Sequence, residues 1–173
     1  MVSNGLVLVG DAACQVNPIH GGGIGPSMVA GRIAGEVVAK ALEKGEASRE
    51  NLWEYNRRFM EVYGAKQAGL DVFRMFLQGL SDEDLNYGMS RRLLREEDVL
   101  RVSVSGEVEL GVGEKLSRAL RGLSKPLFLL KLRAVLRMVK RVKKFYLNYP
   151  DPKGFEGWRR RVENAFREVS KFC

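Results

Sequence analysis

The chain has 173 residues, 45% of them hydrophobic, which fits about one ordinary globular domain with a real core. No apolar run approaches the roughly 20 residues of a membrane-spanning helix. Two cysteines, Cys14 and Cys173, exclude a disulfide scaffold and favour an intracellular, cytoplasmic protein. The net charge of +8 is uneven: residues 1–100 hold 11 basic and 14 acidic side chains, and residues 101–173 hold 18 and 7. Any acidic partner is therefore expected at the C-terminal part.

The first predicted elements are a strand and a helix. Leu6–Val9 is a short apolar run before a glycine and predicts a buried strand. Pro26 suits the first turn of a helix that extends to about Lys44. Gly31 and Gly35 lie one turn apart on that helix, where they would let another backbone pack closely at a cost in helix propensity.

Helices are predicted over most of the remaining chain. Ser48 is the expected N-cap of a helix that continues to about Leu77, with bends at Gly64 and Gly69, and Ser81 caps the next helix. The stretch VSVSGEVELGVG is ambiguous, because its alternation predicts a hairpin while a helix over residues 96–104 fits equally well. Further helices are predicted at residues 114–121, 124–147 and 155–171.

The expected fold class is mainly α, with one short N-terminal strand followed by helices. A single buried strand needs partners for its backbone groups on both sides. The strand is therefore expected either to belong to a sheet supplied from elsewhere or to be frayed. We divide the chain into residues 1–47, with the strand, a glycine loop and the first helix, and a helical region of residues 48–173.

The stretch GDAACQVNPIHGGGIG, residues 10–25, carries the pattern of a ligand site. It begins with a glycine and an aspartate at the end of the strand, where a ligand can approach the backbone and a carboxylate can accept hydrogen bonds from hydroxyl groups. Its glycine run presents bare N–H groups at the start of a helix, which favour an anion or an electron-rich carbonyl. It is neither a P-loop nor the G-x-G-x-x-G fingerprint of a first Rossmann turn, and no metal site is predicted.

The segment Leu6–Leu42 resembles the second flavin-contacting motif of FAD-dependent monooxygenase-like oxidoreductases, the group around p-hydroxybenzoate hydroxylase. Within that group, GDAACQVNPIHGGGIGPSMVAGRIAGEVV is most similar to archaeal geranylgeranyl reductases, which reduce isoprenoid double bonds of membrane lipids. The strand would then be left from a Rossmann-like FAD-binding fold. Residues 48–173 resemble the C-terminal helical region of these reductases more weakly.

The resemblance implies FAD as cofactor and assigns residues to its site. Asp11 would contact the ribityl chain, and Gly23 and Ile24 would contact the edge of the isoalloxazine ring. The residues that would shape the pocket are Gly10, Ala12, Pro18, Gly21 and Gly22. No catalytic residue is assigned.

In the family this motif lies late in the chain, after the G-x-G-x-x-G dinucleotide fold and the sheet that covers the substrate. The chain therefore resembles a C-terminal portion of such an enzyme. Three explanations stay open: a truncated product, a misplaced start and one half of a split enzyme. The isolated chain is expected to be inactive. Together with the missing N-terminal half, or a full-length reductase, the expected reaction is hydride delivery from reduced flavin to an isoprenoid lipid double bond.

Two side chains of the loop have a plain and a chemical interpretation. His20 could tune or relay a proton at the flavin, but we favour a loop residue hydrogen-bonded to backbone. For Cys14 we favour a small buried side chain over a redox thiol.

The segment SKPLFLLKLRAVLRMVKRVKKFYLNYP has helical spacing of apolar residues and no acid between Ser124 and Asn148. A basic amphipathic helix over Lys131–Lys144 could lie on an anionic membrane surface, giving a peripheral protein on the inner face of the membrane. A packed helix with a solvated basic face fits equally, and nucleic acid binding is not expected because no recognition motif is present. The alternative functions are a non-enzymatic basic helical module that binds a membrane or a partner protein, and a piece of another FAD-dependent monooxygenase-like dehydrogenase.

Overall fold

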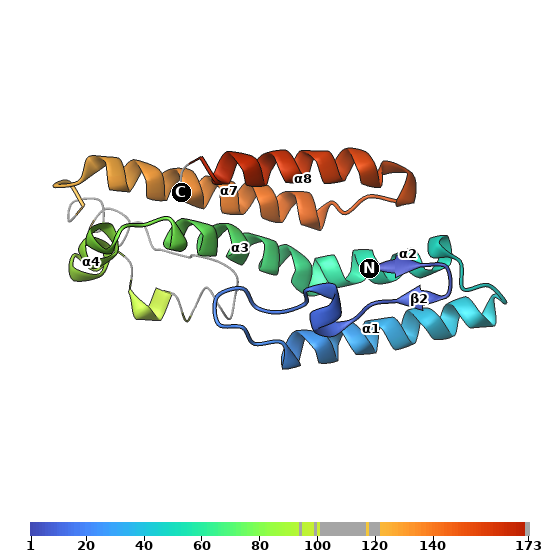
Figure 1. The fold of residues 1–173 in the computed structure, drawn as a ribbon. Helices are drawn as coiled ribbons and strands as arrows, with labels where there is room; N and C mark the ends of the chain where they lie inside the picture. Colours follow the sequence, from blue (N-terminus) through green and yellow to red (C-terminus); the bar gives the residue numbers. More distant parts are fainter. Residues whose placement is uncertain (94, 99, 101–116, 118–121, 172–173) are drawn as a thin grey trace.

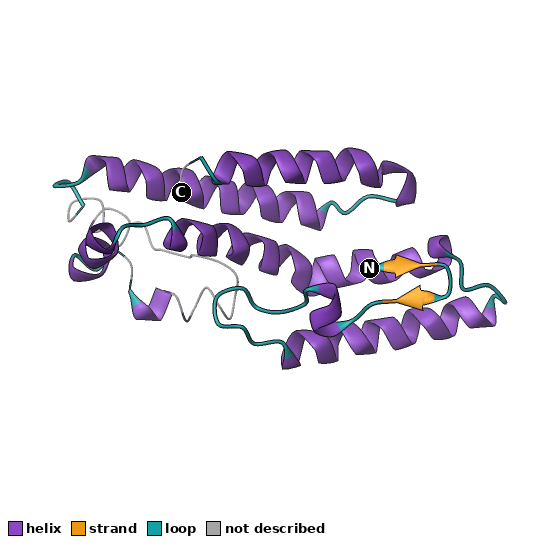
Figure 2. Cartoon of the chain, viewed as in Figure 1, coloured by secondary structure: helices purple, strands orange, loops and turns teal. Residues whose placement is uncertain are grey.

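The computed structural model describes residues 1–93, 95–98, 100, 117 and 122–171. Its elements are β1 (Val2–Ser3), β2 (Leu6–Val7), the 3-10 helix η1 (Gly10–Ala13), α1 (Ile24–Glu43), α2 (Arg49–Phe59), the π-helix η2 (Met60–Gly64), α3 (Ala65–Gln78), α4 (Asp82–Ser90), α7 (Pro126–Leu147), the 3-10 helix η3 (Pro152–Gly154) and α8 (Phe155–Val169). The mainly α fold class is confirmed (Figure 2). Of the helix predicted over residues 96–104, the structure describes 96–98 and 100, which are helical, whereas the alternative hairpin in VSVSGEVELGVG lies outside the described residues. The helix predicted over 114–121 also lies outside them except for Ser117, which is helical.

The helices form three layers (Figure 1). A central rod runs through α2, η2 and α3; α1 and the hairpin lie on one side of it, and the antiparallel pair α7 and α8 lies on the other. The expected N-caps are confirmed, since the Ser48 hydroxyl accepts a hydrogen bond from the Asn51 N–H and the Ser81 hydroxyl accepts one from the Asp84 N–H. The sequence therefore placed the starts of α2 and α4 correctly.

The two glycines expected to bend the central rod act differently. Gly64 closes the π-helix, and the Met60 side chain fills the space that a Cβ there would need. Gly69 lies inside the continuous helix α3, where a Cβ would meet Val139 Cγ1 at 3.3 Å and Lys143 Cγ at 3.2 Å. Gly69 therefore allows α3 and α7 to approach closely.

Two apolar clusters hold these layers together. One joins α1 to α2 through residues such as Ile33, Val37 and Tyr55. The other joins α3 to α7 and α8, with Phe76 and Val142 at its centre. Both faces of the central rod are thus covered.

The N-terminal strand differs from its prediction in two ways. The structure has a second strand, β1, which pairs with β2 antiparallel in the register Val2↔Val7 and Ser3↔Leu6. The connecting Asn4-Gly5 has the left-handed φ of +67° at its glycine, a strong hairpin signal that the sequence interpretation missed. The prediction of a buried strand is also wrong, because Leu6 is 51% exposed and Leu8 and Val9 are partly exposed as well.

An aromatic cluster connects the end of α2 to the turn between α7 and α8. The Tyr149 ring lies 4.8 Å from Trp158 and 5.7 Å from Trp53, measured between centroids. The Trp53 indole N–H donates to the Pro150 carbonyl at 2.7 Å. Burial among these rings raises the pKa of Tyr149 to about 12.

This raised pKa predicts a loss of stability at alkaline pH. The folded state holds the phenol proton more tightly than the unfolded chain, so the contribution of Tyr149 is complete below the ordinary pKa near 10 and is lost as pH rises toward 12. Urea unfolding across this window should show a steeper loss for the parent than for Tyr149→Phe. Parallel pH profiles for the two proteins would contradict the assignment.

Candidate functional site

The Asp11 carboxylate lies against Gly23, twelve residues further along the chain. A Cβ on Gly23 would stand 2.6 Å from Asp11 Oδ1, closer than real side chains approach. Asp11 is held in η1, directly after the hairpin, and Gly23 is the N-cap of α1. The fold therefore brings together an exposed acid and the start of a helix, and glycine is the residue that permits their contact.

The first turn of α1 is open to a ligand. Gly23 provides no side-chain cap, and no acidic residue lies in the first turn. Ile24 is 82% exposed, and Ser27 Oγ turns inward to donate to the Gly23 carbonyl at 2.7 Å. The positive end of the helix dipole thus faces outward beside a carboxylate. This arrangement suits a ligand that offers both hydroxyl donors and an electron-rich acceptor edge.

The loop between η1 and α1 is held by Asn17, which is buried. Its backbone N–H donates to the Gly22 carbonyl at 2.9 Å, and its carbonyl accepts from the Gly21 N–H at 2.8 Å. Its side-chain oxygen accepts from the Ile19 N–H. Asn17 also hydrogen-bonds to Tyr63 in η2. Burial raises the pKa of Tyr63, and this hydrogen bond partly offsets the rise. The loop is consequently fastened to itself and to the central rod.

The remaining predicted site residues occupy the same loop. Gly10 and Gly21 both have left-handed φ values, of +69° and +72°, which a residue with a side chain rarely adopts. Gly10 is buried under Ser27, Pro18 is half-buried, and Ala12 is exposed on η1. The structure therefore gathers the predicted residues from Gly10 to Ile24 around one helix start.

His20 is exposed, and its Nδ1 accepts a hydrogen bond from the Gly22 N–H at 3.1 Å. The favoured interpretation, a loop residue bonded to backbone, is confirmed. The interpretation of Cys14 as a buried side chain is wrong. Cys14 is an exposed thiol in the left-handed conformation, with φ +55°, at the end of η1.

Gln15 is a buried connection that sequence reasoning missed. Its Oε1 accepts from the Gly10 N–H at 2.6 Å, and its Nε2 donates to the Tyr55 hydroxyl at 2.6 Å. The Tyr55 hydroxyl in turn donates to the Leu8 carbonyl at 3.0 Å. Burial raises the pKa of Tyr55, and the bond to Gln15 opposes that rise. The two side chains fix the end of β2 and the start of η1 to α2.

A cavity of about 390 Å³ lies behind this loop. It is bounded by Cys14 and Pro18 from the loop, by Phe59 and Met60 from the central rod, and by Phe166 from α8. Gln67 closes one side, where its Nε2 donates to the Val16 carbonyl at 2.6 Å. The loop thus separates a mainly apolar cavity from the open start of α1.

These features define a glycine-rich loop that places a carboxylate beside the open N-terminus of a helix. A digeranylgeranylglycerophospholipid reductase of Sulfolobus acidocaldarius is 44% identical over 172 residues, 99% of this chain and 38% of that relative. Reductases of the same name from Methanothrix thermoacetophila and Methanopyrus kandleri are 44% and 42% identical over 106 and 114 residues, which are 61% and 65% of this chain and 26% and 28% of those relatives. The chain belongs to the digeranylgeranylglycerophospholipid reductase family. No protein-family model matches it.

The chain spans only about two fifths of the length of the Sulfolobus relative, and less of the other two. In the part of the chain that the structure describes, no helix combines the length and apolarity needed to cross a membrane.

Proposed function

We propose that the chain forms the ring-contacting and helical part of a flavin-dependent reductase of geranylgeranyl double bonds in membrane lipids. The observation that carries this proposal is the contact of Asp11 with Gly23 at the uncapped start of α1, in a chain 44% identical to a reductase of that name. Catalysis also requires the portion of the relatives that this chain does not span.

The residues present fit the ribityl and ring parts of FAD. The Asp11 carboxylate can accept hydrogen bonds from ribityl hydroxyls, and the backbone at Gly23 and Ile24 can face the electron-rich edge of the ring. Gly21 leaves room for close approach, because a Cβ there would meet nothing within 4 Å, whereas the His20 ring lies against Gly22. Reduced flavin, when bound, supplies the hydride for the alkene. The 173 residues hold no G-x-G-x-x-G fingerprint for the pyrophosphate, so the chain alone should bind FAD weakly.

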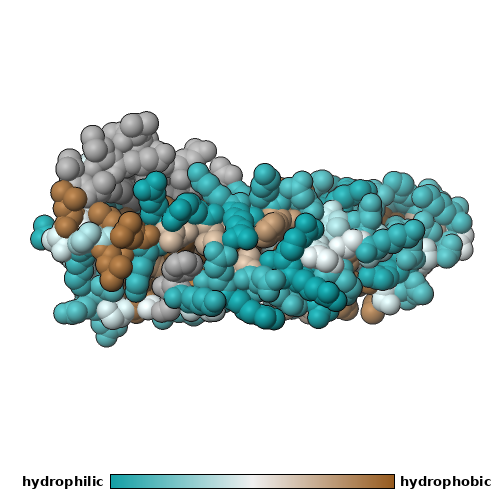
Figure 3. Space-filling view, turned by 90° about the horizontal axis from the view of Figure 1, so that it is seen from above, coloured by the Kyte–Doolittle hydropathy of each residue, from teal (hydrophilic) through white to brown (hydrophobic). Residues whose placement is uncertain are grey.

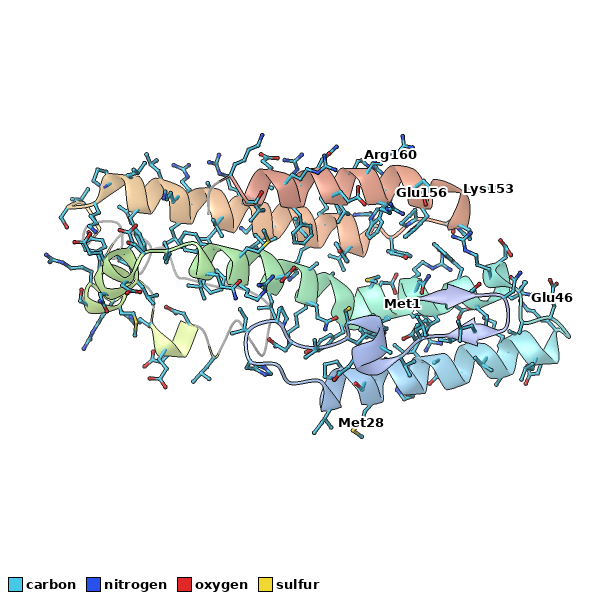
Figure 4. All side chains as sticks on the ribbon, in the orientation of Figure 1. Met1, Met28, Glu46, Lys153, Glu156 and Arg160 are labelled. Carbon is cyan, nitrogen blue, oxygen red and sulfur yellow. The ribbon has the colours of Figure 1, made fainter. Side chains whose placement is uncertain are left out.

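The outer face of α1 supports assembly with another polypeptide. Ile24, Met28 and Leu42 are 82%, 72% and 63% exposed, and helical spacing places them on one face with Gly31 and Gly35. A Cβ at either glycine would meet nothing within 4 Å. Figure 4 shows Met28 projecting away from the rest of the molecule. The close packing expected at these glycines is thus not supplied by the described part of this chain, and an added partner can supply it.

An FAD titration followed by flavin fluorescence tests the proposal. The chain is titrated alone and mixed with a separately expressed N-terminal portion of the Sulfolobus relative. Tight binding is expected only in the mixture and not for the isolated chain. Asp11→Ala should weaken binding in the mixture about ten- to hundredfold, because charge-assisted hydrogen bonds are lost. Glu83→Ala, which removes an exposed carboxylate on α4, is the matched control and should leave binding unchanged.

Equal weakening by both variants, or no binding in the mixture, would contradict the proposal. The second result would favour the non-enzymatic basic module, for which the acid-free helix α7 is the supporting feature.

A further inference from the structure

Helix α7 carries a continuous basic stripe. Its 22 residues contain seven Lys and Arg and no acid. Four of the basic residues recur three or four positions apart and therefore share one side of the helix. They are all exposed: Arg133, Arg137, Lys140 and Lys144.

The stripe faces away from the two neighbouring helices. Val139 and Lys143 of α7 lie over Gly69, so that side of α7 meets α3. Arg141 pairs with Glu168 at 2.8 Å, so the next side meets α8. No ion pair joins the four stripe residues to an acid within the described residues. Their charge is therefore directed to whatever lies outside.

Apolar side chains extend the same surface at the start of α7. Leu127 and Leu130 are 67% and 61% exposed, and their spacing places them on neighbouring positions of the helix. Helical geometry puts Leu130 in line with Arg137 and Lys144. Figure 3, which looks onto the α7 and α8 layer, shows hydrophobic atoms gathered at one end and hydrophilic atoms over most of the remaining length.

We propose that this face of α7 binds the surface of an anionic lipid bilayer, with Leu127 and Leu130 inserted between lipids and the basic stripe on the headgroups. Charge complementarity selects the anionic surface, and the exposed leucines at the start of α7, of which Leu130 is in line with the stripe, favour a bilayer over a purely polar polyanion. This inference rests on the proposed function in one respect, since a reductase of lipid chains has to reach them in a membrane. Binding itself requires neither flavin nor catalysis.

Vesicle co-sedimentation tests the proposal on the complete chain. The vesicles contain phosphatidylcholine alone or phosphatidylcholine mixed with anionic phosphatidylglycerol. Binding is expected to the mixed vesicles and to weaken as salt is added. Each basic residue near such a surface contributes roughly fivefold to binding, so Arg137→Glu/Lys140→Glu/Lys144→Glu should lose about a hundredfold. Leu127→Ser/Leu130→Ser should lose about tenfold with no change in charge.

A matched control variant separates the effect of this site on vesicle binding from the effect of net charge. Arg57 is exposed on α2, and Lys44 and Arg91 are exposed at the C-caps of α1 and α4. Reversing all three changes the total charge by the same amount. That variant should bind within a few-fold of the parent. Equal losses in the two charge-reversed proteins, equal binding to neutral vesicles, or preferential capture by duplex DNA at the same salt would each overturn the proposal. FAD binding in the assembled enzyme is measured separately, so failure here leaves the flavin proposal standing.

Discussion

Gly35→Leu is expected to weaken association with the N-terminal portion of a related reductase by about a hundredfold, while the chain itself becomes slightly more stable. Position 35 is open in this structure, so the added side chain meets nothing within 4 Å. Replacing glycine inside a helix adds about 1 kcal/mol to the free energy of unfolding. A partner backbone packed on α1 would instead meet four extra carbon atoms, an overpacking cost of about 1–3 kcal/mol or more.

The matched control is Gly157→Leu, at an equally open position on α8. It changes the helix in the same way but lies on the opposite side of the central rod from α1 (Figure 1). Isothermal titration calorimetry with the N-terminal portion measures association, and urea unfolding measures stability. Unchanged association for Gly35→Leu would show that the partner does not pack on this face.

Gln15→Leu is expected to lower the free energy of unfolding by about 3 kcal/mol. The substitution nearly preserves side-chain volume but removes the acceptor of the buried Gly10 N–H and the donor to Tyr55. An unsatisfied buried donor costs about 1–3 kcal/mol, and the two lost hydrogen bonds add to that. Tyr55→Phe should cost less, because the Leu8 carbonyl that it leaves lies on a partly exposed residue and can bind water. The Gln15 amide, which loses Tyr55 as acceptor, keeps its contact with Met1 Sδ at 3.3 Å.

Urea unfolding of Gln15→Leu, Tyr55→Phe and the double variant measures these losses. The double variant should fall short of the sum, because the two residues belong to one network. Gln78→Leu is the control, since its exposed amide bonds only to Arg74, and it should change stability by less than about 0.5 kcal/mol. An equal effect at positions 15 and 78 would contradict the role assigned to Gln15.

The helices were largely predictable because their signals are local. Ser48 and Ser81 cap their helices as expected, and helices α1, α7 and α8 begin and end within about two residues of the predictions. The candidate loop was also predictable, because its glycines and its aspartate form a recognisable pattern. Burial was predicted less well: Leu6 of β2 and Cys14 are exposed, and the burial of Gln15 was missed. Burial depends on which elements pack together, and a short apolar run or a single polar residue does not encode that.

By itself, the sequence determined the helical class, the caps, the glycine-rich loop before α1 and the concentration of basic residues in α7. Only the tertiary structure decided that Asp11 meets Gly23, that Gly69 is closed against α7 while Gly35 stays open, and that one side of α7 keeps its charges exposed. The physical reason is the distance along the chain over which the deciding interactions act. Caps and periodicity act within a few residues, whereas each of these outcomes is set by contacts between elements far apart in the chain.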